Sequence, residues 1–173
     1  MIKFKRRTVP EYISYALIVA VGVILDQITK MLAVRHLRPI DTLPLIEGVL
    51  HFTYVENRGA AFGMLADARY VFIITSTIMI LALSVYLILG YAQNALYASS
   101  VCLIISGGIG NMIDRLALGY VVDFIDFRLI NFAVFNVADS FVCVGAGLLI
   151  LALVIDLIKE AKAKKSGDGK DNE

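Results

Sequence analysis

Four long apolar segments constrain this chain more than any other feature of its sequence. They cover residues 12–34, 70–90, 95–113 and 137–158, and each is close to the roughly 20 residues that a helix needs to cross a bilayer. Hydrophobic residues make up 59% of the chain and charged residues 18%, with a mean hydropathy of +0.79. This composition is far from that of a soluble domain. We therefore predict an all-α integral membrane protein with four transmembrane helices.

The charges at the two ends of the chain predict its organisation in the membrane. Lysines and arginines precede the first apolar segment at residues 3–7 and follow the fourth at residues 159–165. The positive-inside rule then places both termini in the cytoplasm. A basic start before an apolar run is also typical of a secretory signal peptide, but no small-residue cleavage site follows, so we expect a retained helix. Residues 1–160 should form one membrane-embedded domain and residues 161–173 a flexible cytoplasmic tail.

The segments 35–69 and 115–136 then face the opposite side of the membrane. Residues 50–55 are rich in β-branched and aromatic residues, which predicts a short strand. A strand pair forms if residues 121–128 are also extended. Residues 60–65 are apolar but too short to span, which favours a loop in the membrane interface. We expect a small extracytoplasmic β-containing element with an interfacial loop.

Four aspartates lie in or beside the apolar segments: Asp26, Asp114, Asp123 and Asp139. An ionisable side chain at membrane depth is a candidate for function. Asp26 is four residues before Lys30, so the two share a helix face and can form an ion pair. We interpret this pair as structural, with a proton relay as the alternative.

The third apolar segment ends in a polar stripe. Gly107, Asn111, Asp114 and Arg115 lie on one face of a helix. The glycine allows another helix to approach closely, and Arg115 offers charge compensation to its neighbour Asp114. Packing alone does not require three hydrogen-bonding side chains, so we expect this polar face to project toward whatever fills the gap beside the glycines.

Asp123 and Asp139 are separated by only 15 residues on the same predicted side of the membrane. Each alone could be a loop charge or a helix N-terminal acid. Two adjacent carboxylates cannot both ionise cheaply, so one tends to keep a proton. Such a pair can activate a water molecule and protonate a leaving nitrogen. The sequence therefore predicts an acid–base pair, with Asp139 as the ionised member if it begins a helix.

Other catalytic sets compete poorly with this pair. The hydroxyl side chains lack a suitably placed histidine, and His36 and His51 are the only imidazoles, which argues against a metal site. Cys102 and Cys143 lie in apolar segments and are expected to be buried as small hydrophobes. No cofactor is implied.

Five short motifs, in order along residues 26–140, resemble the lipoprotein signal peptidase family, also called bacterial signal peptidase II. They are DQITK from residue 26, NRGAAF from 57, GGIGNMIDR from 107, VVDFI from 121 and FNVADS from 135. The resemblance implies a membrane aspartic endopeptidase in the bacterial cytoplasmic membrane, with its site near the extracytoplasmic face. Its partners would be membrane lipid and prolipoproteins that carry a diacylglyceryl group on a cysteine, cleaved just before that cysteine. We expect a monomer that binds no nucleic acid.

The resemblance also assigns roles to individual residues. Asp123 and Asp139 match the catalytic pair of the family. Positions that line the site or contact substrate are matched by Asn57, Gly59, Asn111, Arg115 and Asn136. Positions that hold the architecture together are matched by Asp26, Lys30 and Asp114. The chain departs from the family at residues 131–134, where NFAV replaces a bulky aromatic residue and a proline, and this affects the expected shape of the site rim.

Two other functions are compatible with parts of the sequence. In a small transporter or proton conductor, the four aspartates would form a relay across the bilayer. In a non-enzymatic scaffold, the glycine-rich third segment would serve only helix packing. A relay requires acidic residues distributed across the thickness of the bilayer, whereas these four gather toward one face. A scaffold leaves Asp123 and Asp139 unexplained.

Overall fold

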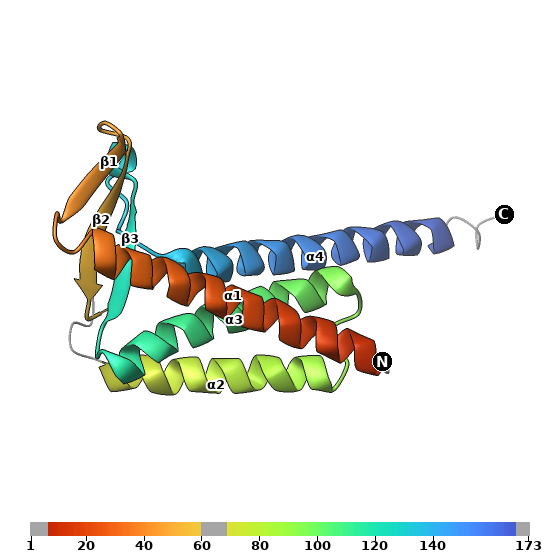
Figure 1. Ribbon diagram of the computed structural model, residues 1–173. Coiled ribbons are helices and arrows are strands. Elements are labelled where there is room, and N and C mark those ends of the chain that lie inside the picture. Colours follow the sequence, from red (N-terminus) through yellow and green to blue (C-terminus); the bar gives the residue numbers. More distant parts are fainter. Residues whose placement is uncertain (1–6, 60–68, 169–173) are drawn as a thin grey trace.

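The computed structural model describes residues 7–59 and 69–168. Its four long helices are α1 (Val9–His36), α2 (Arg69–Ile88), α3 (Ala95–Ala117) and α4 (Val137–Asp168). Each contains a stretch that is long and apolar enough to cross a membrane. The predicted all-α membrane architecture is confirmed (Figure 1). The ends of α1, α2 and α3 differ from the apolar segments by at most four residues, whereas α4 continues ten residues past residue 158.

The local sequence explains where two of the helices begin. Thr8 and Glu11 form a capping box before α1, and Pro10 occupies the first turn, where its missing N–H costs nothing. Asn94 caps α3, because its side-chain oxygen accepts hydrogen bonds from the backbone N–H groups of Leu96 and Tyr97. These caps satisfy N–H groups that a helix leaves without partners.

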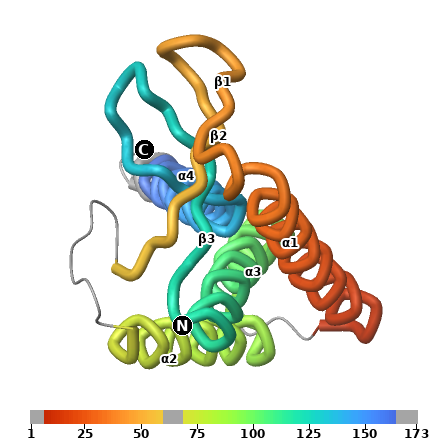
Figure 2. The backbone as a smooth tube through the Cα atoms, turned by 60° about the vertical axis from the view of Figure 1, so that its left-hand side comes forward, coloured from red at the N-terminus to blue at the C-terminus, as the bar shows by residue number. Residues whose placement is uncertain are grey.

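Helix α3 is the centre of the bundle and packs against the other three helices (Figure 2). Half of its most apolar stretch is buried, against 6% for α2. Its buried residues Ala98, Val101, Cys102 and Ile105 form the main apolar core together with residues of the neighbouring helices. Large apolar side chains elsewhere on the bundle are exposed, as expected where lipid replaces water as the solvent.

Glycines in α3 allow this close packing. Gly107 lies against the Ala138 carbonyl at the start of α4, and Gly110 lies against the Asp26 carboxylate of α1. A side chain at either position would fill space that the neighbouring helix occupies. The glycine-rich segment therefore brings three helices together at one level of the bundle.

A three-stranded antiparallel sheet caps one end of the bundle (Figure 1). Its strands are β1 (Thr42–Ile46), β2 (Leu50–Asn57) and β3 (Val121–Asp126), with β2 in the middle. The predicted pairing between residues 50–55 and 121–128 is confirmed, and β1 is an additional strand. A short 3-10 helix, η2 (Arg128–Ile130), follows β3. The predicted interfacial loop at residues 60–65 lies outside the described residues.

The segment between η2 and α4 returns to the sheet. Phe135 forms an isolated antiparallel bridge with Ile125, and its carbonyl accepts hydrogen bonds from the N–H groups of Phe124 and Ile125. The first turn of α4 is thereby fixed to β3. Helix α1 begins and α4 ends at the other end of the bundle, away from the sheet (Figure 1).

We expect Gly107→Ala to lower the stability of the folded protein. The added methyl group would collide with the Ala138 backbone and the Val142 side chain, an overpacking that costs about 1–3 kcal/mol. Thermal unfolding in detergent micelles should show a lower midpoint. The control is Gly147→Ala, at an exposed helix position where an added Cβ meets nothing within 4 Å. Equal midpoints for the two variants would contradict the proposed packing role of Gly107.

Candidate active site

A cavity of about 560 Å³ lies where the sheet meets the helix bundle. Its wall is mostly apolar and includes Phe72, Val134 and Phe135. Six of the residues that the sequence analysis selected also line it: Asn57, Gly59, Asn111, Arg115, Asp123 and Asp139. Residues from β2, β3, α3 and the start of α4 therefore converge on one space.

Asp123 reaches the cavity from the middle of β3 and is 1% exposed. Its two carboxylate oxygens each accept a hydrogen bond from an amide. Asn57 Nδ2 donates to Oδ2 at 2.8 Å, and Asn136 Nδ2 donates to Oδ1 at 2.6 Å. The Asn57 side-chain oxygen also accepts a hydrogen bond from the Gly59 N–H at 2.9 Å, a local turn that fixes the direction of this amide.

Asp139 stands in the first turn of α4, where the free backbone N–H groups favour a negative charge. Its Oδ1 accepts a hydrogen bond from Asn111 Nδ2 at 2.7 Å, and its Oδ2 accepts one from the Asn136 backbone N–H at 3.2 Å. The Asp139 N–H in turn donates to Asn136 Oδ1 at 2.9 Å. Asn136, which is fully buried, therefore contacts both carboxylates.

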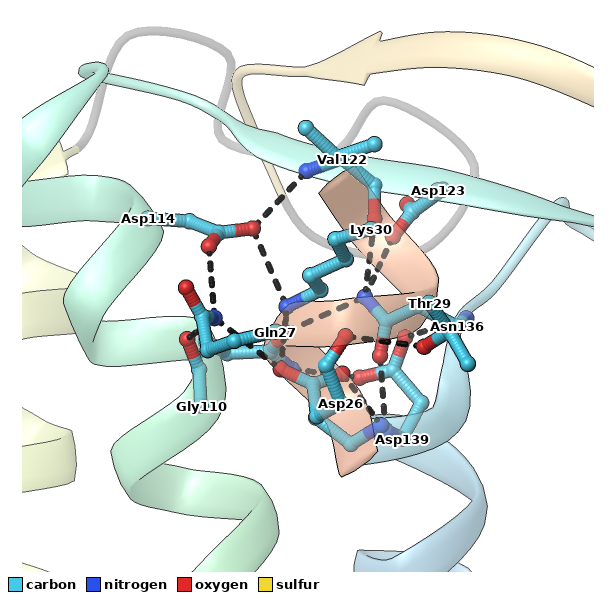
Figure 3. A network of polar contacts seen from close by, with 12 residues as sticks. Asp26, Gln27, Thr29, Lys30, Gly110, Asp114, Val122, Asp123, Asn136 and Asp139 are labelled. Atoms are coloured by element: carbon cyan, nitrogen blue, oxygen red, sulfur yellow. Dashed lines mark hydrogen bonds and ion pairs between the residues drawn. The ribbon is translucent and has the colours of Figure 1, made fainter. Parts of the chain in front are cut away.

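The remaining two aspartates belong to a buried ion cluster beside the cavity (Figure 3). Lys30 Nζ lies 3.0 Å from Asp26 Oδ2 and 3.0 Å from Asp114 Oδ2. The predicted pairing of Asp26 with Lys30 is confirmed. Asp114 pairs with Lys30 across the helices, whereas the sequence had suggested its neighbour Arg115.

The carboxylates of the ion cluster also accept backbone hydrogen bonds, which hold four elements together. Asp26 Oδ1 accepts a hydrogen bond from the Ala138 N–H of α4 at 2.9 Å. Asp114 Oδ2 accepts one from the Val122 N–H of β3 at 3.1 Å. Helices α1 and α3 are thus linked to both segments that carry Asp123 and Asp139.

Arg115 lies on the cavity wall with its guanidinium 4.9 Å from the centroid of the Phe72 ring. The guanidinium has no hydrogen-bond partner among the described residues, so its N–H donors are available to a ligand in the cavity. A planar guanidinium with five N–H donors suits the oxygen atoms of a peptide.

The electrostatic environment of Asp123 gives its carboxyl group a higher pKa than that of an ordinary carboxylic acid. Burial and the nearby charge of Asp139 raise its pKa from the usual 3.8 to about 7, although the hydrogen bonds from Asn57 and Asn136 oppose this shift. At neutral pH the site can therefore hold a proton on one carboxyl group next to a second one. The two carboxyl groups titrate as a coupled pair.

Several residues of the site were not selected from the sequence. Gln27 donates hydrogen bonds to Asp26, Asp114 and the Gly110 carbonyl, and its place next to Asp26 was a usable signal. Cys143 was expected to be buried but is exposed and lines the cavity, one helical turn after Asp139. Cys102 is buried as predicted.

The described residues contain no group of three or more His, Cys, Asp or Glu side chains arranged to hold a metal ion. The polar side chains on the cavity wall include two carboxyl groups, the amides of Asn57 and Asn111, and the Arg115 guanidinium. Such a set can activate water and stabilise an oxyanion.

We expect Asp123→Asn to stabilise the protein more at pH 8 than at pH 4.5. The raised pKa means that the folded state binds a proton that the unfolded chain releases near pH 4. Wild-type stability is therefore lost as the pH rises from about 4 to about 7, by up to about 4 kcal/mol. An uncharged amide escapes this loss. Unfolding midpoints of both proteins at the two pH values measure the difference.

The control for this experiment is Asp126→Asn on the same strand. Burial tends to raise the pKa of Asp126, but hydrogen bonds from Arg128 and Thr53 outweigh it and hold the pKa below its usual value. This aspartate therefore stabilises the fold above pH 4, and its replacement should destabilise the protein at both pH values. A stability gain for Asp123→Asn that does not depend on pH would contradict the assigned pKa.

Comparison with known proteins places this arrangement in a family. A family model described as signal peptidase (SPase) II matches residues 18–155. The lipoprotein signal peptidase of Caldanaerobacter subterraneus subsp. tengcongensis is 52% identical over 132 residues, which cover 76% of this chain and 90% of that protein. That of Halothermothrix orenii is 44% identical over 140 residues, with 79% and 92% covered.

Solved structures agree with the sequence relatives. A bacterial membrane enzyme structure obtained by the in meso method at 2.3 Å resolution superposes with a TM-score of 0.79 and 33% identity, covering 90% of this chain and 94% of that one. A second, at 1.9 Å resolution, gives a TM-score of 0.75 and 33% identity. The four apolar helices, the small sheet and the matched sequence together show that this chain belongs to the lipoprotein signal peptidase (signal peptidase II) family.

Proposed function

We propose that this protein is an aspartic endopeptidase that removes the signal peptide from diacylglyceryl-modified prolipoproteins, with Asp123 and Asp139 as its catalytic pair. The observation that carries the proposal is their position on the wall of one cavity, with Asn136 in contact with both. Membership of a signal peptidase family supports the substrate class. Beyond what family membership supports, we propose the aspartic type of catalysis, the two catalytic residues and the bond that is cleaved.

The proposed mechanism needs one protonated and one ionised carboxyl group. Asp123, with a pKa of about 7, is the better proton carrier, and Asp139 at the start of α4 is the better carboxylate. Asp139 removes a proton from water while the water oxygen bonds to the scissile carbonyl carbon. Asp123 donates its proton to the developing oxyanion. In the collapse of the tetrahedral intermediate, the C–N bond breaks as Asp139 gives the proton that it took from water to the leaving nitrogen. Asp123 recovers its proton from the hydroxyl group of the intermediate as the carbonyl forms again.

The walls of the cavity fit a lipidated peptide. Phe72 of α2, Cys143 of α4 and residues 132–135 present an apolar surface beside the two carboxyl groups. A signal peptide can enter laterally from the bilayer, keep its diacylglyceryl chains in lipid, and place the peptide bond before the lipidated cysteine at the catalytic pair. Arg115 is positioned to bind a substrate carbonyl oxygen over the Phe72 ring.

The proposed orientation has both termini in the cytoplasm and the site near the extracytoplasmic face of the membrane. Arg7 and Lys159 lie at the bundle end away from the sheet, where positive charge favours the cytoplasm. The sheet and the cavity lie at the other end (Figure 1). One chain supplies all of the proposed catalytic groups, so we propose that a monomer is active.

The alternatives account for less of the structure. A proton relay requires acids spread through the bilayer, but Asp26, Asp114, Asp123 and Asp139 gather in one network near the sheet (Figure 3). A packing scaffold explains the α3 glycines and leaves the polar cavity without a role.

We expect Asp123→Asn and Asp139→Asn each to reduce cleavage of a diacylglyceryl-modified prolipoprotein by at least about a hundredfold, since each removes an acid–base group. The assay compares purified wild type and variants in detergent micelles and follows the release of the signal peptide by mass spectrometry. The expected product begins with the lipidated cysteine. The same prolipoprotein without its diacylglyceryl group tests whether the lipid is required.

The matched control is Asp126→Asn, which changes a β3 carboxylate that bonds Thr53 and Arg128 and does not line the cavity. It should retain cleavage at a temperature where the variant is folded. Near-normal cleavage by either of the first two variants would exclude the catalytic pair. Cleavage at a different bond would exclude the proposed product.

A further inference from the structure

The Lys30 ammonium lies behind the cavity wall and uses all three of its N–H donors. Two of them face Asp26 and Asp114, each at 3.0 Å. The third donates to Asn111 Oδ1 at 2.8 Å. Neither Lys30 nor its two carboxylate partners line the cavity, whereas Asn111 does. The hydrogen bond to the Asn111 amide is therefore the contact between Lys30 and the cavity wall.

This contact fixes the direction of the Asn111 amide. An ammonium can only donate hydrogen bonds, so the amide oxygen must face Lys30 and the NH₂ group must face Asp139, to which it donates at 2.7 Å. A rotated amide would place its NH₂ group against the ammonium and leave both buried groups unsatisfied, which costs free energy.

The same oxygen also directs the second amide of the site. Asn111 Oδ1 accepts a hydrogen bond from Asn136 Nδ2 at 3.1 Å, and that Nδ2 donates to Asp123 Oδ1 at 2.6 Å. The opposite end of the Asn136 side chain accepts from the Asp139 N–H. A continuous chain of hydrogen bonds thus runs from Lys30 to both carboxyl groups.

Lys30 also balances the charge around the site. Among the residues that the structure describes, the charged groups facing the pair are Lys30 and Asp26 from α1, and Arg115 and Asp114 from α3, while β2 contributes the uncharged Asn57. If Asp123 and Asp139 share one proton, three negative charges face two positive ones. Removal of the Lys30 charge doubles the net negative charge and favours uptake of a second proton.

We propose that Lys30 is a positioning residue of the proposed catalytic pair: it orients the Asn111 amide toward Asp139 and keeps one of the two carboxyl groups ionised at neutral pH. This inference rests on the proposed function. A purely structural Lys30 would hold the helices together but would not change how the pair binds protons.

The test removes Lys30 together with one of its two partners, so that no additional uncompensated carboxylate remains buried. The variant is Lys30→Met/Asp114→Asn, and its control is Asp114→Asn, which retains the ammonium. A second variant, Lys30→Gln/Asp114→Asn, keeps a donor for Asn111 without the charge. It also carries the test if the methionine variant does not fold.

The first measurement is an infrared titration of the protein without substrate. The protonated carboxyl band that disappears in Asp123→Asn reports the proton of the pair. In wild type this band should be lost around pH 7. In both Lys30 variants it should persist to a pH about one unit higher or more than in Asp114→Asn, which differs from them only in keeping the Lys30 charge. In Asp114→Asn it should not move upward, because that change removes a negative charge.

The second measurement is the pH dependence of kcat/KM for the lipidated prolipoprotein. Its alkaline limb reports loss of the proton of the pair and should move up with the infrared band, relative to Asp114→Asn. Its acid limb reports protonation of the ionised carboxylate and should also move up in the Lys30 variants, which lowers kcat/KM about tenfold on that limb for each pH unit. If the folded Lys30 variants show the same titration and the same acid limb as Asp114→Asn, the inference is overturned. If the titration shifts as expected but wild type does not cleave the prolipoprotein, the proposed function fails while the role of Lys30 stands.

Discussion

The structure depends on one buried positive charge. The Lys30 side chain is 4% exposed, and it lies between two carboxylates that are equally inaccessible. Transfer of these charges from water is costly, and only close pairing with additional hydrogen bonds offsets the cost. The cluster meets this requirement because Gln27 and the Ala138 N–H bind the two carboxylate oxygens that do not face Lys30. The Val122 N–H adds a second hydrogen bond to the Asp114 oxygen that does. The same bonds join α1, α3, α4 and β3 at the level of the cavity.

This arrangement explains how a small membrane protein can keep a polar cavity beside lipid. Helix α3 supplies glycines where the neighbouring helices approach, and then Asn111 and Arg115 where the cavity opens. The sheet closes the end of the bundle and presents Asp123 from a buried strand. Apolar packing in the part of the bundle away from the sheet holds the helices in place. The hydrogen bonds of the ion cluster determine where the polar groups point.

Much of this could be predicted from the sequence because the signals are local. The helices follow from hydropathy and length, the Asp26–Lys30 pair from its four-residue spacing, and the main strand pair from its β-branched and aromatic residues. Apart from this strand pair, contacts between distant segments could not be predicted in this way. The pairing of Lys30 with Asp114, the strand β1 and the exposure of Cys143 all depend on how helices and strands pack against each other. The roles of Asp123 and Asp139 stay predictions until cleavage is measured.

The backbone pairing of Phe135 with Ile125 has a consequence for how the site tolerates bilayers of different thickness. Transmembrane helices change their tilt when the bilayer becomes thicker or thinner. Here the start of α4 is held to β3 by backbone hydrogen bonds, and Asn136 links the two carboxyl groups directly. The distance between the two carboxyl groups is thus set within a short stretch of chain at the sheet. The helix ends away from the sheet can therefore tilt with a change in bilayer thickness without altering that distance.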